Sequence, residues 1–191
     1  MANRYKFQTV LDGFVSVGED SGKFNNRTFA YTIPTDVLPK VEADREELLQ
    51  WAKSKTTGRV QEAMTPWDEA GVCKYTYGAG DGSRKPKPEP VFVDTNGDAI
   101  PREVLLTVRK GTKVNLIVDQ KPYAMGPNVG TSMKVVGVQI VELVTANGAV
   151  DSGDLSVEDV AAMFGNVDGY KADSPAVRDA RPEDEATDYD F

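Results

Sequence analysis

Apolar and polar residues alternate along much of residues 1–145, which is the pattern of β-strands. Residues 4–17 alternate loosely, are rich in Val, Phe and Thr, and include Gly13, so we expect one long first strand with a bend. Residues 27–33 predict a second strand, on which every second residue from Arg27 to Ile33 shares one face. Further strand-like runs follow at residues 72–77, 91–93, 103–109, 113–120 and 132–144.

Residues 41–55 are the long segment with helical spacing, because apolar residues from Val41 to Ala52 recur at intervals that share one helix face. Many short strands with one longer helix among them are typical of a small barrel such as the five-stranded OB-fold. We therefore predict a mainly β chain, with an OB-fold-like five-stranded barrel, one longer helix and extra short strands in residues 1–145. Residues 146–191 are predicted to form a linker, a short helix at Ser156–Phe164 and a disordered acidic tail.

The acidic charge of the chain is concentrated at its C-terminal end. The 191 residues carry 22 Lys and Arg against 30 Asp and Glu, a formal net charge of −8. Residues 1–140 hold 19 bases and 17 acids, a net +2, whereas residues 141–191 hold 3 bases and 13 acids, a net −10. A net charge of −8 would argue against a nucleic-acid partner. A mildly cationic body with an anionic tail does not argue against such a partner.

The sequence offers little chemistry for catalysis. It contains no His, which removes Ser-His-Asp triads and His-ligated metal sites, and its single Cys73 can form no internal disulfide. Residues 94–98 have the spacing that opens a calcium loop, but Ala99 and Leu105 stand where that loop needs Gly and Glu. We expect no catalytic residue, no metal site and no cofactor. With neither a secretion signal nor a membrane segment apparent, we also expect a cytoplasmic protein.

Basic and aromatic residues are interleaved in the strand-like runs, as at residues 5–7 and 74–77. Single-stranded nucleic acid suits this mixture, because cations contact phosphates and flat rings stack on bases at ~1–3 kcal/mol per base. The phenylalanines are more typical of a core, whereas the tyrosines keep a polar tip, and the sequence leaves open whether each is core or contact. The candidate DNA-binding residues are Lys6, Arg27, Tyr31, Lys74, Tyr75, Tyr77, Arg84, Lys85, Lys87, Arg109, Lys113, Lys121, Tyr123 and Lys134.

Residues 111–143 resemble the closing strands of tailed-bacteriophage single-stranded DNA-binding proteins. A Val- and Lys-rich strand from Lys113 is followed by a Gly-containing loop and by a last strand that reads Gly-Val-Gln-Ile-Val-Glu-Leu from Gly137. The acidic C-terminus is similar to the tails of that family. The residues of the tail that would contact partners are Asp188, Tyr189, Asp190 and Phe191.

This resemblance implies an OB-fold that binds single-stranded DNA regardless of sequence and protects it during phage DNA replication, recombination and repair. It places the protein in the host cytoplasm and implies a tail that recruits replication proteins such as the polymerase and the helicase-primase. We expect the tail to fold back over the basic groove until DNA displaces it. The sequence leaves open DNA against RNA, the number of nucleotides covered, and a monomer against a homodimer.

Two alternative functions remain at this point. The first is a virion structural or assembly protein without DNA-binding activity. The second is a metal-dependent nuclease that uses acids such as Asp94, Asp98 and Glu103. We rank the nuclease last, because these acids surround a turn and have no partnering Lys motif.

Overall fold

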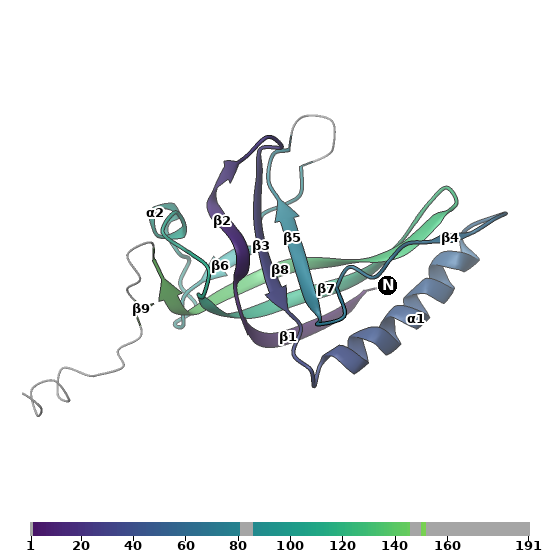
Figure 1. The fold of residues 1–191 in the computed structure, drawn as a ribbon, viewed down its shortest axis with the longest axis horizontal. Helices are drawn as coiled ribbons and strands as arrows, with labels where there is room; N and C mark the ends of the chain where they lie inside the picture. The colour runs from purple at the N-terminus through teal and green to yellow at the C-terminus, as the bar shows by residue number, and fades with distance from the viewer. Residues whose placement is uncertain (1, 81–85, 146–149, 152–191) are drawn as a thin grey trace, which may run out of the picture. The chain divides into compact units, whose positions relative to one another are not determined.

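The computed structural model describes residues 2–80, 86–145 and 150–151, which belong to a unit running from Met1 to Ser152. A six-stranded sheet contains β1, β7, β8 and β4 in that order, with β6 and β9 also paired to β8, and a three-stranded sheet has the order β2-β3-β5. The strands are β1 (Asn3–Val10), β2 (Asp12–Ser21), β3 (Asn26–Thr32), β4 (Gln61–Glu62), β5 (Val72–Tyr77), β6 (Val91–Val93), β7 (Lys113–Met125), β8 (Asn128–Val144) and β9 (Val150–Asp151). The helices are α1 (Leu38–Ser54) and α2 (Arg102–Leu105). The predicted mainly β, OB-fold-like architecture is confirmed (Figure 1).

The predicted long first strand is two strands that lie in different sheets. β1 pairs with β7 and β2 pairs with β3, so this one segment joins the two sheets into a curled half-barrel. The break falls at Leu11, whose backbone N–H donates to Thr112 O at 2.9 Å. Gly13 lies just inside β2, where its φ of +67° coincides with a register shift between Asp12 and Ser16. The predicted irregularity at Gly13 is therefore present, but the pairing partner has already changed at Leu11.

Helix α1 confirms the predicted helix and begins slightly earlier, at Leu38. Its buried residues include the predicted Val41 and Ala52, and the helix packs against β7 and β8. A proline in the first turn suits this start, because the first helical N–H groups have no partner within a helix.

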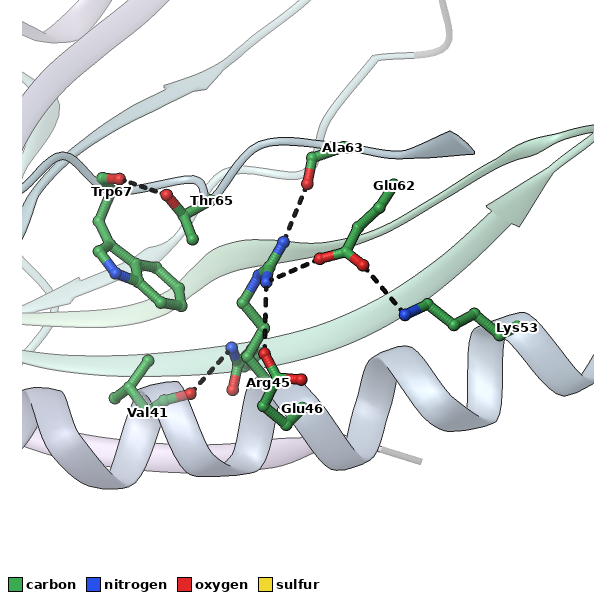
Figure 2. A network of polar contacts seen from close by, with 9 residues as sticks. Val41, Arg45, Glu46, Lys53, Glu62, Ala63, Thr65 and Trp67 are labelled. Atoms are coloured by element: carbon green, nitrogen blue, oxygen red, sulfur yellow. Dashed lines mark hydrogen bonds and ion pairs between the residues drawn. The ribbon is translucent and has the colours of Figure 1, made fainter. Parts of the chain in front are cut away.

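A polar network joins α1 to β4, as Figure 2 shows. The buried Arg45 guanidinium donates to Glu62 Oε1 at 3.3 Å and to Ala63 O at 2.9 Å. Glu62 also accepts from Lys53 at 3.0 Å through its second oxygen. The Ala63 N–H in turn donates to Val129 O at 2.8 Å, so Arg45 connects the helix to the turn end of the β7–β8 hairpin.

The prediction of a strand at residues 103–109 is wrong, because this segment forms the short helix α2 followed by a turn. Leu105 and Val108 are buried at 6% and 1% exposure, whereas Val104 and Leu106 are 36% and 41% exposed. That spacing of three is helical, and a strand would have buried alternate residues. The apolar run therefore misled the strand assignment.

The hairpin of β7 and β8 is longer than predicted at both strands. The runs expected at residues 113–120 and 132–144 extend to Met125 and begin at Asn128, with the turn at Gly126 and Pro127. As a result, Lys121-Pro122-Tyr123 lies within β7 and pairs with Gly130–Ser132. We placed the end of the first domain at residue 145. Strand β9 lies beyond that residue and pairs with the end of β8.

Two predicted features lie outside the described residues, namely the helix at 156–164 and the acidic tail. Within residues 2–80, 86–145 and 150–151, no helix is both long and apolar enough to span a membrane.

Candidate nucleic-acid interface

The outer face of the six-stranded sheet gathers basic side chains from three strands. β1 buries Tyr5 and Phe7 and exposes the residues between them, and β7 buries Val114, Leu116 and Val118 in the same alternating way. We name the opposite side of this sheet the cationic face. Its residues are Arg4, Lys6 and Gln8 from β1, Asn115, Ile117, Asp119, Lys121 and Tyr123 from β7, Ser132, Lys134 and Gln139 from β8, and Val91 and Val93 from β6.

The charges on this face are arranged in rows across the strands. Arg4 lies opposite Asp119, which lies opposite Lys134. Arg4 Nε and Nη2 donate to the two Asp119 carboxylate oxygens at 2.7 and 3.1 Å. These hydrogen bonds lower the pKa of Asp119, so its carboxylate stays charged and neutralises only one neighbouring cation.

Lys6 and Lys134 have no carboxylate within 4.0 Å of the ammonium group among the described residues. Lys121 lies 4.0 Å from Asp119, which is a weak contact at an exposed position. Lys113, at the far end of β7, is instead neutralised by Glu142 at 2.6 Å. The uncompensated positive charge is thus concentrated in the middle of the face, level with residues 117–121 of β7.

Tyr123 is the aromatic residue of the cationic face, and it lies between these cations and the hairpin turn. It pairs with Gly130 across the hairpin, and a Cβ added to Gly130 would lie 2.5 Å from the Tyr123 hydroxyl oxygen and 2.6 Å from Cζ. The ring therefore lies across Gly130, where a side chain would displace it. Because Lys121 precedes Tyr123 by two residues, ammonium group and ring share one face of β7. This arrangement places an aromatic ring beside a cation.

The prediction that four tyrosines stack on bases is wrong for three of them, because these three belong to the core. Tyr31, Tyr75 and Tyr77 are 0%, 5% and 1% exposed. All three rings pack against Phe29, with centroids 6.3 Å apart for Phe29 and Tyr31, and Tyr75 stacks on Tyr77 at 5.6 Å. Burial also raises the pKa of the Tyr31 hydroxyl. A ring without exposed surface in this fold offers no face to a base.

Arg27 is also wrong as a DNA contact, since its side chain is buried in ion pairs. Its guanidinium lies 3.2 Å from Asp20 and 2.6 Å from Glu89, and 5.9 Å from the centre of the Tyr77 ring. It shares the inward face of β3 with Phe29, as the spacing of two predicts. Arg27 therefore ties the ends of β2 and β3 to the segment before β6.

The remaining predicted cations do not gather on the cationic face. Lys74 is exposed on β5, in the other sheet, and Lys87 is exposed where its backbone pairs with Gly78. The Arg109 guanidinium donates to the carbonyl oxygens of Leu106 and Val108, after α2. Arg84 and Lys85, like the tail residues 188–191, lie outside the described residues.

Sequence reasoning missed Arg4 and the row of amides formed by Gln8, Asn115 and Gln139. Arg4 could have been found, because it is separated from Lys6 by two residues and must share its face. The amide row could not, because it depends on the register between β1, β7 and β8.

Two of the acids considered for a nuclease, Asp94 and Asp98, lie in one turn, and the third, Glu103, lies in α2. The Asp94 carboxylate accepts hydrogen bonds from the backbone N–H groups of Asn96 and Asp98, at 2.8 and 3.0 Å. Within the described part of the chain, no group of three or more acidic, His or Cys side chains is placed to hold a metal ion.

Comparisons with known proteins find similarity in structure only. No protein-family model and no curated protein sequence matches the chain. Its fold is similar to that of gp2.5, a single-stranded DNA-binding protein encoded by bacteriophage T7, with a TM-score of 0.50 and 18% identity over 90% of this chain and 100% of that one. This likeness confirms, for the fold, the resemblance inferred from the sequence.

The single-stranded DNA-binding protein of bacteriophage Enc34 is also similar, with a TM-score of 0.48 and 11% identity over 82% of this chain and 89% of that one. The same protein in complex with single-stranded DNA gives a TM-score of 0.48 and 12% identity over 72% of this chain and 85% of that one.

Proposed function

We propose that this protein binds single-stranded DNA without sequence preference, along the cationic face. The observation that carries the proposal is that Lys6, Lys121 and Lys134 share one face of the sheet with the Tyr123 ring, while the Asp119 carboxylate on that face is already paired with Arg4. The fold shared with gp2.5 supports the same function.

Each part of this face has a separate task. The ammonium groups of Lys6, Lys121 and Lys134 contact phosphates and release the counterions that surround them, which makes binding depend on salt. The Tyr123 ring stacks on a base, and any base offers a suitable π-face, so stacking does not read the sequence. A base paired in a duplex does not present that face, so the site favours single strands.

The proposal extends to the biological role and to the tail. The protein protects single strands during phage DNA replication, recombination and repair, in the host cytoplasm. The acidic tail competes with DNA for the cationic face, and when displaced it recruits the polymerase and the helicase-primase through Asp188, Tyr189, Asp190 and Phe191. The support for this part is the separation of charge along the sequence, +2 in residues 1–140 and −10 in residues 141–191.

A salt titration with a fluorescent single-stranded oligonucleotide tests the binding site. For single strands, the slope of log K against log salt is about −0.7 per phosphate contacted, so Lys6→Ala and Lys134→Ala should each make it shallower by about 0.7. The matched control is Lys40→Ala, which removes the same charge from α1, where Lys40 pairs with Asp44 at 2.7 Å. Its slope should equal that of the wild-type protein.

A wild-type protein that shows no retention on single-stranded DNA, as a virion structural protein would, refutes the proposed function. So does a salt-independent affinity. Equal slopes for the two face variants and the control would place binding on another surface.

A further inference from the structure

A hollow with aliphatic walls interrupts the cationic face. Lys6, Ile117 and Gly137 are neighbours on β1, β7 and β8, and Val91 of β6 continues the row as the partner of Gly137. Because Gly137 has no side chain, a gap of about 390 Å³ opens between Ile117 on one side and Val91 on the other. Val136, which bulges out of the register of β8, also lines the hollow.

The wall formed by β6 is the exposed side chain of Val91. Val91 is 64% exposed, whereas Phe92, the next residue, is buried at 6% and anchors β6 to the core. A single exposed valine is ordinary on a protein surface. Here, however, it faces Ile117 across the hollow, and the side chains of Arg4 and Lys6 form the nearby rim.

A row of amide side chains fixes the width of the hollow. Gln8 donates to Asn115 Oδ1 at 3.3 Å, Asn115 donates to Gln139 Oε1 at 2.8 Å, and Gln139 donates to the backbone oxygen of Asp94 at 3.1 Å. The last bond holds the end of β6 against β8. The hollow is therefore formed before any ligand arrives, and filling it requires little reordering.

We propose that this hollow is a subsite for one base of the bound strand, which inserts between Ile117 and Val91. The inference rests on the proposed function and specifies a part of it. An unpaired base has apolar faces that fit aliphatic walls, and its sugar-phosphate backbone is anionic, which complements Lys6 at the rim. The site thus holds one base without an aromatic ring, on the same face as the Tyr123 stacking position and roughly 20 Å from it along β7.

Two variants test the subsite by opposite changes. Val91→Ser removes one wall, and Gly137→Val fills the hollow. A Cβ at position 137 would lie 3.4 Å from Ile117 Cδ1, an ordinary contact, and Gly137 does not have a positive φ, so the backbone accepts a side chain. Neither variant changes the charge of the face. The control is Val10→Ser, which removes a 45% exposed valine from β1, outside the hollow.

The ligands are a thymidine oligonucleotide and a chain of the same length made of abasic sugar-phosphates. With the thymidine strand, Val91→Ser and Gly137→Val should each bind on the order of tenfold more weakly than the wild-type protein, with an unchanged salt slope. With the abasic chain, all four proteins should bind equally. Thermal melts establish that each variant is folded.

The outcomes distinguish the two proposals. If the wild-type protein binds the thymidine strand with a normal salt slope, but both variants match it, the base subsite is refuted and the proposed function stands. Equal losses on the abasic chain also refute the subsite, because no base is then involved. If the wild-type protein binds neither ligand, the proposed function fails and the subsite with it.

Discussion

The contact between Arg45 and β4 predicts a large loss of stability when the guanidinium is removed. The Arg45 side chain is 8% exposed and donates to Glu62 and to Ala63 O, as Figure 2 shows. Hydrogen bonds to charged groups contribute about 1.5–3 kcal/mol each. Glu62 is 41% exposed, so water solvates it when its partner is lost, which reduces the penalty for an unpaired charge. We therefore expect Arg45→Ala to lower the free energy of unfolding by about 2–4 kcal/mol.

Thermal and urea unfolding measure this loss. For a chain of this length, about 3 kcal/mol corresponds to a fall in Tm on the order of 10 °C. Glu46→Ala is the matched control, because Glu46 lies 3.8 Å from the same guanidinium but is 69% exposed, so its removal should cost less than about 0.5 kcal/mol. A loss below about 1 kcal/mol for Arg45→Ala, or equal losses for the two variants, would refute the reasoning.

The stability lost in Arg45→Ala should also depend on pH, through the ionisation of Glu62. The hydrogen bond from Lys53, and then the charge of Arg45, lower the pKa of Glu62 in the folded protein. A carboxyl group with a lowered folded pKa stabilises the protein above its unfolded pKa of about 4.3 and loses that contribution as the pH falls through the folded value. The difference in free energy of unfolding between the wild-type protein and Arg45→Ala should therefore become smaller at acidic pH. What remains there is the contribution of the hydrogen bond from Arg45 to Ala63 O.

Two further predictions concern the DNA-binding face and the tail. Gly130→Ala should displace the Tyr123 ring and weaken single-strand binding about as much as Tyr123→Ala does, and the double variant should bind no more weakly than either; additive losses would contradict the contact. Removing Glu183–Phe191 should tighten single-strand binding at low salt and have little effect at high salt, as measured by fluorescence anisotropy; unchanged affinity at low salt would exclude competition by the tail.

The spacing between basic and aromatic residues determined which of them share a strand face, and their presence alone did not. Lys74 and Tyr75 are adjacent, so on a strand they must point to opposite faces, and the structure exposes the first and buries the second. Lys121 and Tyr123 are separated by two residues and share one face, and this pair remains on the surface. The interleaved pattern could therefore have been divided into same-face and opposite-face pairs from the sequence alone.

Arg27 shows the limit of that reasoning. Its spacing from Phe29 and Tyr31 correctly placed all three on one face, but not which face of β3 is covered. The mainly β class, the helix and the separation of charge followed from the sequence, because they depend on local periodicity and composition. The register that unites Arg4, Lys6, Lys134 and the hollow at Gly137 was decided only by the tertiary structure. Burial and cross-strand neighbours depend on which strands pair, and pairing joins residues more than 100 positions apart in the chain.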